Sequence, residues 1–261
     1  MPRLPTLFIS HGSPMLAIHD SPASRFLRQL GASLARPRAI LIVSAHWERA
    51  GTPAASLAAL PETIHDFSGF PPALFQLGYP APGAPDCAER ACALLEAAGW
   101  EVERSPTRGL DHGAWVPLRL MYPAADIPVA QLSLLRGATP ARHAQMGAAL
   151  ASLRDEGVLV IGSGSLTHNL YEIAGPDLDA EVPAWVSQFD AWMHDALAAG
   201  RREALLDYRA RAPSAARNHP TEEHLLPLFV ALGAAGDEAK ARRLHASYEY
   251  GVLAMDVYAF E

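Results

Sequence analysis

Three short apolar runs, each followed by a histidine, constrain the fold of this chain more than any other feature. TLFIS leads to His11, ILIVSA leads to His46, and VLVIGSGSLT leads to His168. Buried parallel strands read as near-continuous Val, Ile and Leu stretches, and ligands of open α/β sheets bind beyond the carboxyl ends of such strands. The sequence therefore predicts that imidazoles from distant segments converge at one edge of a sheet, which is how a metal site is built.

The order of the remaining elements predicts a single α/β domain over residues 1–261. Strand-like runs lie at residues 6–10, 39–44, 129–134 and 158–162. They alternate with helical patterns at residues 21–34, 85–98, 140–154, 183–199 and 222–232. Such alternation favours a mainly parallel core sheet flanked by helices. The stretch at residues 241–260 looks like two strands about a Tyr-Gly turn, which predicts an antiparallel C-terminal edge.

Composition and charge narrow the class of partner. Half of the residues are hydrophobic and 19% are charged, as in an ordinary globular enzyme. The net charge of −7 argues against a broad surface for nucleic acid or anionic membrane. We interpret Cys87 and Cys92 as reduced, and the N-terminus and the short apolar runs match neither a signal peptide nor a membrane span. We therefore expect a cytoplasmic protein with no membrane or nucleic-acid partner.

The setting of each histidine indicates which of them bind a metal. His11 and His46 follow buried-type strands, and adjacent strands place their terminal residues about 5 Å apart, within reach of one ion. A third ligand is expected near a helix start with Thr221 as candidate N-cap. The candidates for this ligand are His219, Glu222, Glu223 and His224. The segment is not the H-E-x-x-H motif of zinc proteases, because its two histidines are five residues apart and not four.

His168 and His112 each have two open interpretations. GSGSLT, before His168, lacks the third glycine of a dinucleotide fingerprint and the G-x-S-x-G of a serine hydrolase. His168 is then either a metal ligand or a general base beside the metal. His112 is expected in a turn, where Asp111 could orient its imidazole or where it is simply a satisfied turn histidine. His143 and His194 fall in helical patterns and are expected at the surface.

A segment dense in proline, glycine and aromatic residues interrupts the α/β pattern at residues 61–85. Long irregular insertions in compact domains are usually functional. Its aromatic side chains, beside His65 and Asp66, predict a pocket wall for a planar ligand. The alternative is a loop packed by its own prolines.

Six motifs, in their order along the chain, resemble one family closely. They are SHGSPM, SAHWE, IHDFSGFP, LDHGAW, GSGSLTHNL and EEHLLPL. Over residues 7–260 the chain is similar to the class III extradiol ring-cleaving dioxygenases, specifically their DOPA 4,5-dioxygenase-like branch. One such motif is a weak signal, but six with sensible spacing are specific. The chain departs from the family in SHGSPM, where relatives often have GHGSPM, and this change is conservative.

The resemblance implies a mononuclear non-haem iron(II) site in a single α/β domain. It implies that His11 and His46 are metal ligands and that His224 closes the coordination shell. His168 matches a residue that is either the catalytic base or a fourth ligand when zinc occupies the site. Fe2+ is therefore the implied cofactor for activity, and Zn2+ is able to occupy the same site.

The reaction implied by the resemblance is the extradiol cleavage of a catechol, DOPA-like or otherwise substituted, by O2 to a muconate semialdehyde. His112 matches a histidine that faces the bound substrate or oxygen, and His65 and Asp66 match the substrate-binding segment of the pocket. An arginine or lysine near the pocket would suggest a carboxylate-bearing substrate, and Arg108 is a candidate by its proximity to His112 in the sequence.

Two other functions remain open from the residues alone. A zinc hydrolase could use the same histidines, with a metal-bound water as nucleophile. A non-enzymatic binding protein could use the same fold, although such a protein would be expected to have lost one of the matched histidines. The sequence does not identify the catechol or the oligomeric state.

Overall fold

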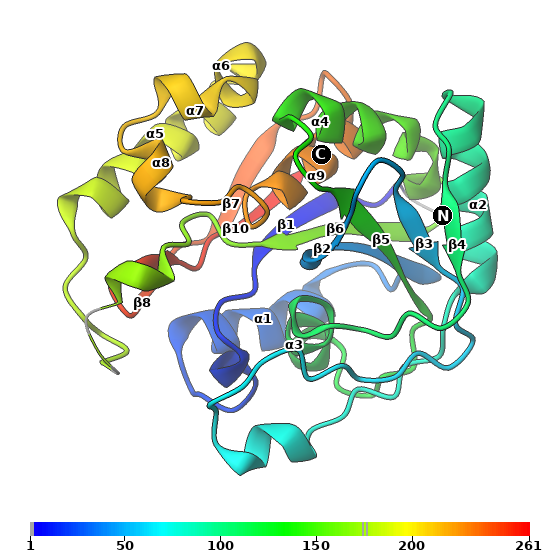
Figure 1. Ribbon diagram of the computed structural model, residues 1–261, viewed down its shortest axis with the longest axis horizontal. Coiled ribbons are helices and arrows are strands. Elements are labelled where there is room, and N and C mark those ends of the chain that lie inside the picture. Colours follow the sequence, from blue (N-terminus) through cyan, green and yellow to red (C-terminus); the bar gives the residue numbers. More distant parts are fainter. Residues whose placement is uncertain (1–2, 174, 176) are drawn as a thin grey trace.

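The computed structural model describes residues 3–173, 175 and 177–261. An eight-stranded sheet with the strand order β4-β3-β5-β2-β6-β1-β10-β7 lies at its centre (Figure 1). The strands of this sheet are β1 (Thr6–Ser10), β2 (Ala39–Arg49), β3 (Ala54–Ser56), β4 (Glu103–Ser105), β5 (Val129–Leu135), β6 (Val158–Gly164), β7 (Ala241–His245) and β10 (Val257–Phe260). A separate hairpin pairs β8 (Tyr248–Glu249) with β9 (Leu253–Ala254).

The four central strands run parallel, as the apolar runs predict. β1 pairs with β6, β6 with β2, and β2 with β5. At one edge β10 lies antiparallel to β1, and β7 lies antiparallel to β10. These pairings confirm a mainly parallel α/β sheet with an antiparallel C-terminal edge. The opposite edge is not predicted by the sequence: β3 runs antiparallel to β5, and β4 pairs with β3.

The C-terminal stretch forms more strands than the two that the sequence predicts. The Tyr250-Gly251 turn connects only the small β8–β9 hairpin, while β7 and β10 flank this hairpin and pair with each other. Glu249 pairs with Leu253, so the loop has three residues, Tyr250 to Val252, and the first two have positive φ values, 55° and 70°.

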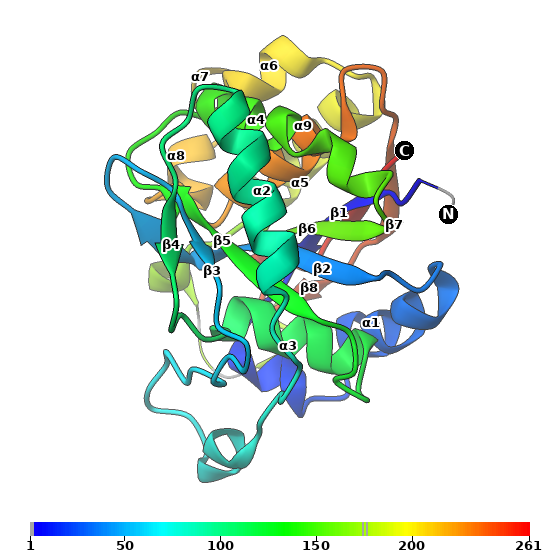
Figure 2. The same ribbon diagram turned by 90° about the vertical axis from the view of Figure 1, so that its right-hand side faces the viewer.

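The helices cover both faces of the sheet. They are α1 (Pro22–Ser33), α2 (Pro85–Ala97), α3 (His112–Met121), α4 (Pro140–Ala149), α5 (Ala184–Ala198), α6 (Arg202–Leu206), α7 (Tyr208–Arg211), α8 (Ala215–Asn218) and α9 (Leu226–Ala235). Figure 2 shows α1 and α3 on one side of the sheet and α4 and α9 on the other. Cys87 and Cys92 lie on α2 as buried free thiols.

Successive side chains of the strands pack alternately into two apolar layers, one on each face of the sheet. Leu7 and Ile9 of β1 pack in the layer that includes α1 and α3, whereas Phe8 packs in the layer that includes α2, α4 and α9. This alternation is the side-chain geometry of a strand. The sheet is therefore buried on both faces, and its edges and strand ends are the places left for a site.

The predicted start of the helix expected at residues 222–232 is wrong. It begins only at Leu226, where Pro227 occupies a first-turn position that accepts proline. Thr221 is therefore not its N-cap, and its hydroxyl instead contacts the carboxylate of Glu223 at 3.0 Å. The segment that carries His224 precedes the helix.

Helix α3 is not predicted by the sequence, although it carries a candidate site residue. It begins at His112, and the side chain of Asp111 caps it by accepting from the amide of Ala114. Gly113 and Pro117 make the sequence of this helix look non-helical, because both residue types are unfavourable inside helices. His112 thus lies in the first turn of a buried helix and not in a loop turn.

The segment at residues 61–85 is irregular, as its composition predicts. Within these residues, all of which the structure describes, the one helical element before α2 is a short 3-10 helix, Pro72–Gln76. The indole of Trp115 in α3 donates to the carbonyl oxygen of Ile64 at 3.0 Å. The segment is therefore anchored on α3.

His143 is not exposed, so its expected surface position is wrong, whereas His194 keeps part of its surface exposed. His143 is fully buried, and its Nε2 atom accepts from the amide of Leu135 at 3.1 Å. His194 is half-buried, with Nδ1 3.3 Å from the hydroxyl of Tyr258. The ring of His143 reaches the amide of Leu135 in β5 and that of His194 reaches Tyr258 in β10, contacts that a helical pattern alone does not show.

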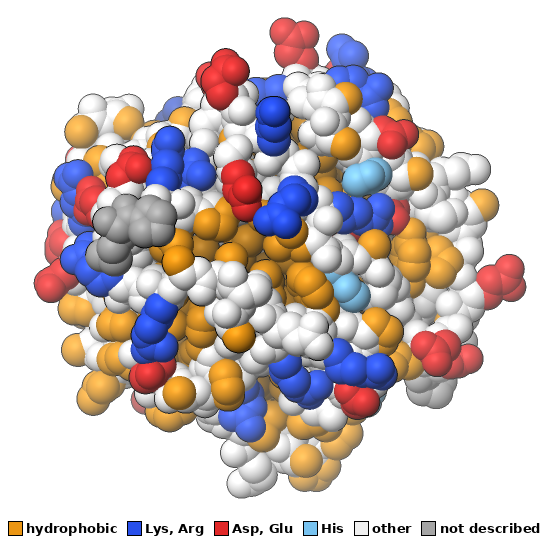
Figure 3. Space-filling view, turned by 180° about the vertical axis from the view of Figure 1, so that it is seen from behind, with side chains coloured by type: hydrophobic (Ala, Val, Ile, Leu, Met, Phe, Trp, Pro, Cys, Tyr) orange, Lys and Arg blue, Asp and Glu red, His pale blue; other side chains and the backbone are white. Residues whose placement is uncertain are grey.

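Among the described residues, no helix combines the length and the apolar character that crossing a bilayer requires. On the face shown in Figure 3, lysine and arginine side chains are interspersed with acidic ones. This mixture agrees with the modest negative net charge of the chain.

Candidate metal centre

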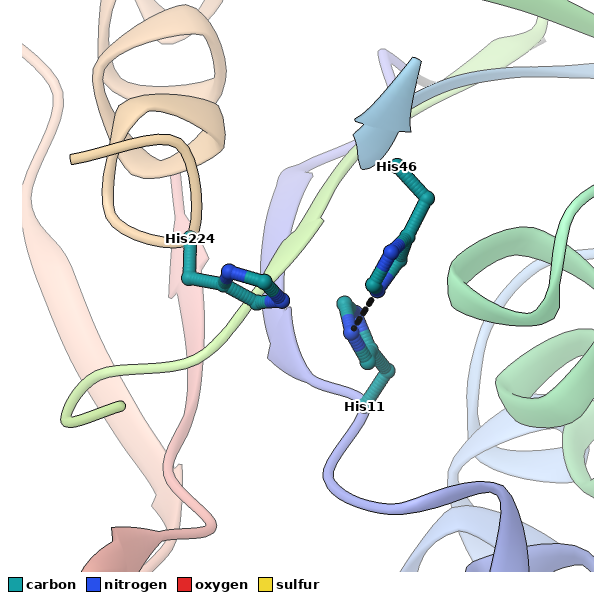
Figure 4. A group of neighbouring side chains, drawn as sticks. All are labelled: His11, His46 and His224. Carbon is teal, nitrogen blue, oxygen red and sulfur yellow. Dashed lines mark hydrogen bonds between the residues drawn. The ribbon is translucent and has the colours of Figure 1, made fainter. Parts of the chain in front are cut away.

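Three histidines from separate segments meet beyond the carboxyl ends of the central strands (Figure 4). His11 follows β1, His46 lies in β2, and His224 precedes α9. One ring nitrogen of each lies within 4.8 Å of the others. The Nε2 atoms of His11 and His46 are 3.0 Å apart. The structure thus brings together both strand-end histidines and one of the four candidates for a third ligand.

An irregularity in β2 directs His46 toward this centre. The sequence predicts a strand that ends at Ser44, but β2 continues to Arg49. Its pairing with β5 shifts between Val43 and Glu48, so the residues between them bulge out of the ladder. Bulges beside active sites commonly redirect a side chain, and His46 lies within this one.

A close backbone approach holds His224 at the end of β6. The amide of Ser165 donates to the carbonyl oxygen of His224 at 2.8 Å. A Cβ atom at Gly164 would lie 2.0 Å from the same oxygen. Glycine at this position is therefore required for His224 to reach the centre.

His219, Glu222 and Glu223, which the sequence offers beside His224 as a third ligand, have different partners. His219 is fully buried, and its Nε2 atom lies 2.9 Å from a backbone carbonyl oxygen. Glu222 accepts a hydrogen bond from the hydroxyl of Tyr208 at 2.7 Å. Glu223 remains beside the centre, where its carboxylate lies 3.0 Å from Nδ1 of His224.

Acceptors behind the rings of His11 and His224 determine which nitrogen faces the centre. Nδ1 of His11 lies 3.0 Å from the hydroxyl of Ser163. That hydroxyl donates to a backbone carbonyl oxygen, so it accepts the ring proton. Nδ1 of His224 faces the carboxylate of Glu223. Because Nδ1 carries the proton in both rings, Nε2 presents its lone pair to the centre.

Asp66 makes three further contacts at the same centre. Its Oδ2 atom lies 3.6 Å from Nδ1 of His46 and 3.0 Å from Nδ1 of His112, the latter at an angle too poor for a hydrogen bond. Its Oδ1 atom accepts from the backbone amide of His112 at 2.9 Å. Burial alone raises the pKa of Asp66, but the contacts with His112 lower it to about 2. The carboxylate is therefore charged at neutral pH.

Asp111 does not orient the imidazole of His112, so that expectation is wrong. Its buried carboxylate accepts from Ser44 at 2.6 Å, from Arg108 at 2.7 Å and from Gln131 at 2.8 Å. These bonds join the end of β2 to the first turn of α3. The partner of the His112 imidazole is instead Asp66, which lies in the irregular segment.

The three Nε2 atoms fit a divalent cation. The Nε2 atoms of His11 and His46 share a hydrogen bond of 3.0 Å whose donor depends on the ring tautomers, and a cation that binds both nitrogens takes the place of the shared proton. Two metal–nitrogen bonds near 2.1 Å at a right angle place their nitrogens about 3 Å apart. The Nε2 atom of His224 is buried and, within the described part of the chain, lacks a hydrogen-bond partner. A ligand atom is expected to show this arrangement.

The three histidine rings of the centre are uncharged at neutral pH, so each is able to donate an electron pair to a metal. Burial and the neighbouring imidazoles hold the pKa of His11 and of His224 well below the ordinary value. The same causes lower the pKa of His46 to about 4. Metal binding requires neutral imidazole, so the rings are already in the charge state that binds a metal.

His168 lies against the centre, stacked on His224. The two ring centroids are 3.4 Å apart and the ring planes differ by 8°. Burial lowers the pKa of His168 to about 4, so the ring is neutral and able to accept a proton. The position is compatible with either role that the sequence leaves open, general base or fourth ligand.

A cavity of about 470 Å³ lies beside the histidines. Its polar part is formed by His46, Asp66, His112, His168 and His224. The rest of its wall is formed by Gly12, Ser13, Pro14, Phe67, Phe70, Leu170, Ile173, Gly175, Tyr250 and Leu253. Two of these side chains come from the segment at residues 61–85, so that segment does form part of a pocket wall.

His65 does not line the cavity, so its expected contact with a substrate is corrected. Its Nε2 atom lies 3.0 Å from the carbonyl oxygen of Leu77. Its ring packs with centroid distances of 5.7 Å to Phe67 and 5.8 Å to Trp115. His65 therefore supports the pocket wall from behind.

Two residues that shape the centre are not predicted by the sequence. A Cβ atom at Gly113 would lie 2.3 Å from Oγ of Ser44 and 2.9 Å from Cδ2 of His46. Ser163 is the acceptor that orients His11. The one signal for Ser163 is that it is a polar residue inside an apolar strand run. Gly113 has no comparable signal, because its importance lies in contacts with other segments.

Known proteins resemble this chain over almost its full length. The family described as the catalytic LigB subunit of aromatic ring-opening dioxygenase matches residues 5–260. The 4,5-DOPA dioxygenase extradiol of Beta vulgaris is 46% identical over 98% of this chain and 96% of its own length. The protein of the same name from Escherichia coli K12 is 40% identical over 89% of this chain and 85% of its own length.

A solved structure agrees with the fold. The crystal structure of an uncharacterised protein from Escherichia coli K12 covers 99% of this chain and 100% of its own, with a TM-score of 0.82 and 33% identity. Sequence motifs, fold and relatives lead to the same family. The chain therefore belongs to the LigB family of aromatic ring-opening dioxygenases, within its 4,5-DOPA extradiol branch, and is an enzyme of the extradiol class.

Proposed function

We propose that the chain binds one Fe2+ through His11, His46 and His224 and cleaves the ring of a catechol with O2 to give a muconate semialdehyde. The observation that supports this proposal most is the convergence of three Nε2 atoms beside a cavity of about 470 Å³. Cavities of this size hold small molecules such as a substituted catechol. A bound iron(II) supplies the electron transfer between the catechol and O2.

Three imidazoles suit this chemistry better than four. A facial set of three leaves coordination positions open for small ligands, whereas a fourth imidazole closes one of them. The same donors fit Zn2+, which we propose as an alternative occupant with His168 as a fourth ligand. In the iron form we assign His168 to proton transfer.

His168 and His112 handle protons in this proposal. A neutral ring nitrogen of His168 accepts the proton of a catechol hydroxyl in this proposal, because the ring lies against the metal ligands and is uncharged at neutral pH. Nδ1 of His112 faces Asp66, so its Nε2 atom is left to contact the substrate or oxygen. Asp66 orients this ring and does not itself need to touch the substrate.

The test is oxygen uptake by the full chain after anaerobic loading with Fe2+. Addition of catechols is expected to consume O2 and to produce the yellow absorbance of a ring-fission product, with monophenols as the control substrates. Protein that retains iron but shows neither signal across a catechol panel would contradict the proposal.

A zinc hydrolase is the second candidate, because the histidine centre fits zinc equally well and a zinc-bound water is a nucleophile near neutral pH. Ester or amide cleavage by zinc-loaded protein without O2 consumption would favour it. Membership of a ring-opening dioxygenase family argues against it and also against a non-enzymatic binding protein.

We further propose that residues 1–261 form one catalytic domain located in the cytoplasm, with only small-molecule partners. The family match over residues 5–260 supports a single catalytic unit. The two free thiols of α2 are consistent with a reducing compartment. Cell fractionation of the tagged chain tests the location.

A further inference from the structure

The apolar wall of the cavity consists of Phe67, Phe70, Leu170, Ile173 and Leu253. The rings of Phe67 and Phe70 pack edge to face with centroids 5.4 Å apart. Arg108, the candidate from the sequence for contact with a substrate carboxylate, does not line the cavity, and its guanidinium pairs with Asp111 at 2.7 Å. A polar substituent of a substrate is therefore recognised by another group of the cavity.

Two hydroxyl groups, those of Ser13 and Tyr250, also line the cavity. The hydroxyl of Ser13 has a structural role, because it accepts from the amide of Met15 at 3.3 Å and caps the 3-10 helix Pro14–Ala17. For the hydroxyl of Tyr250, the contacts of the described residues include no hydrogen-bond partner. A phenolic hydroxyl that is taken out of water usually has such a partner. When a ligand displaces water from the cavity, the ligand itself is the group that is able to provide one.

The backbone of Tyr250 has an uncommon conformation, with a φ value of 55°. Glycine, asparagine and aspartate adopt positive φ values most readily, whereas bulky side chains are unfavourable there. Residues held in such conformations are concentrated at active sites and ligand-binding segments. An aromatic residue at the tip of this hairpin therefore indicates a role for its side chain.

The surrounding backbone fixes the tip of the hairpin. The amide of Tyr250 donates to the carbonyl oxygen of Leu178 at 2.9 Å. A Cβ atom at Gly251 would lie 2.6 Å from another backbone carbonyl oxygen of the same loop. Glu249 is 2% exposed, and its Oε2 atom lies 3.7 Å from the place that a Cβ atom would take at Gly12. The fold therefore holds the residue that carries the phenol in one position at the cavity.

The phenol of Tyr250 is a hydrogen-bond donor at neutral pH. Burial, followed by the neighbouring carboxylate of Glu249, raises the pKa of Tyr250 above its ordinary value. The hydroxyl therefore keeps its proton, and a carboxylate or carbonyl oxygen is the partner that accepts it.

We infer that Tyr250 is a specificity-determining residue whose hydroxyl donates a hydrogen bond to an oxygen atom on the ring substituent of the catechol. The inference rests on the proposed function, in which the two catechol oxygens meet the histidine centre and the substituent meets the wall. In a mainly apolar pocket, a few placed polar groups fix the orientation of the ligand. A carboxylate gains most, because hydrogen bonds to a charged acceptor are the stronger ones. A substituent without oxygen gains nothing from the hydroxyl.

Tyr250→Phe, which removes only the hydroxyl, tests the inference with a matched pair of substrates. Dihydrocaffeate carries a carboxylate on its substituent, whereas the propyl group of 4-propylcatechol has no acceptor oxygen. In oxygen uptake by the iron-loaded full chain, the variant is expected to lower kcat/KM for dihydrocaffeate at least about tenfold, mainly through a higher KM. For 4-propylcatechol, kcat/KM is expected to change by less than about twofold, because no hydrogen bond is lost.

Tyr171→Phe is the matched control. Tyr171 is 91% exposed and does not line the cavity. The same loss of a hydroxyl at this position is expected to leave kcat/KM for both substrates near the values of the unsubstituted protein.

The outcomes separate this inference from the proposed function. Equal losses for the two substrates in Tyr250→Phe, or no loss for dihydrocaffeate, overturn the inference and leave the proposed function intact. An absence of oxygen uptake by the unsubstituted chain with both compounds, despite bound iron, overturns the proposed function.

In that case calorimetric titration of the zinc-loaded chain with the same two compounds still tests the role of Tyr250. The inference predicts that Tyr250→Phe raises the Kd for dihydrocaffeate and leaves that for 4-propylcatechol unchanged. Equal Kd values for dihydrocaffeate in the variant and the unsubstituted protein, or no binding of dihydrocaffeate, overturn it.

Discussion

The two parts of the cavity are built in different ways. At the histidine centre, two of the three rings come from the ends of sheet strands and the third, His224, is held against β6, and His11 is 1% exposed. The apolar wall comes from the irregular segment at residues 61–85, the loop near Leu170 and the β8–β9 hairpin. Strand ends are fixed by the sheet, whereas loops tolerate change in sequence. The core therefore fixes the chemistry, whereas recognition of the substituent depends on segments that vary more easily.

The polar contacts of the two parts differ in the same direction. Behind the histidine rings lie polar partners, among them buried Ser163 and partly exposed Glu223. The wall side chains contact one another mainly through ring and aliphatic packing. Substitutions at the centre should therefore affect metal binding and kcat, whereas substitutions at the wall should affect KM.

The largest effect is expected from His11→Ala. Loss of one of three donors should lower metal affinity by more than the roughly 10–100-fold that follows loss of an outer partner of a ligand. Iron per chain after gel filtration, measured by atomic absorption, checks this. His194→Ala, on α5 and outside the centre, is the control. Full iron occupancy in His11→Ala would remove this ligand from the account.

His168→Ala should separate proton transfer from metal binding. We expect iron to be retained and kcat to fall by about 10²–10⁴-fold, the usual contribution of a general base. Steady-state oxygen uptake together with metal analysis measures both. Loss of iron, with activity restored by excess iron, would instead make His168 chiefly a ligand.

Gly113→Ala tests whether close packing behind the rings positions them. The new Cβ atom would lie 2.3 Å from Oγ of Ser44 and 3.1 Å from Cε1 of His11, so the rings must shift. Metal affinity should fall by about tenfold or more, although alanine is the better helix former. Gly78→Ala is the matched control, since its nearest neighbour would be 3.8 Å away. Equal affinity in the two variants would contradict the packing argument.

Phe70→Ala tests the wall with a smaller expected effect. Removing one of the two edge-to-face rings should raise KM for an apolar catechol by at most about tenfold. Iron content and kcat should change little, because no metal ligand contacts this ring. A large fall in iron content would show that wall and centre are not independent.

The smallest effect concerns stability at acid pH. Burial, which is the largest cause, lowers the pKa of His219 from 6.5 to about 3. Above pH 6.5 the ring is neutral in both states, so its contribution to stability is fully present. As the pH falls from 6.5 toward 3, the His219 ring binds a proton in the unfolded chain but not in the folded chain. Stability is then lost by at most about 1.4 kcal/mol per pH unit for this group.

Urea unfolding of chelator-treated protein between pH 8 and pH 5 measures this loss. His219→Gln keeps a donor for the carbonyl oxygen that His219 contacts, but it cannot titrate. The variant should therefore show a shallower decline of the unfolding free energy toward acid pH. Equal slopes for the two proteins would show that His219 does not titrate as described.

Much of the fold and two of the three converging histidines are predictable from the sequence. The apolar runs before His11 and His46 indicate buried parallel strands, and parallel strands bring their carboxyl ends to one edge. Local rules are sufficient here, because each histidine is tied by the chain to its own strand. The same reasoning predicts His168 near the centre, where the structure stacks it on His224.

The remaining features depend on contacts between segments that no local pattern encodes. Asp66 and His112 are 46 residues apart in the chain, so local reasoning favours the adjacent Asp111 as the partner. The bulge that redirects His46 arises from pairing with β5. The choice of His224 over His219 follows from which ring the backbone places against β6. Arg108 is near His112 in sequence, but its guanidinium forms an ion pair with the buried carboxylate of Asp111.

X-ray absorption at the iron edge of stoichiometrically loaded protein tests the central claim most directly. We expect one tightly bound iron per chain, with the multiple-scattering pattern of about three imidazoles at roughly 2.1 Å. A first shell that contains only oxygen ligands, or fewer than two imidazoles, would contradict it.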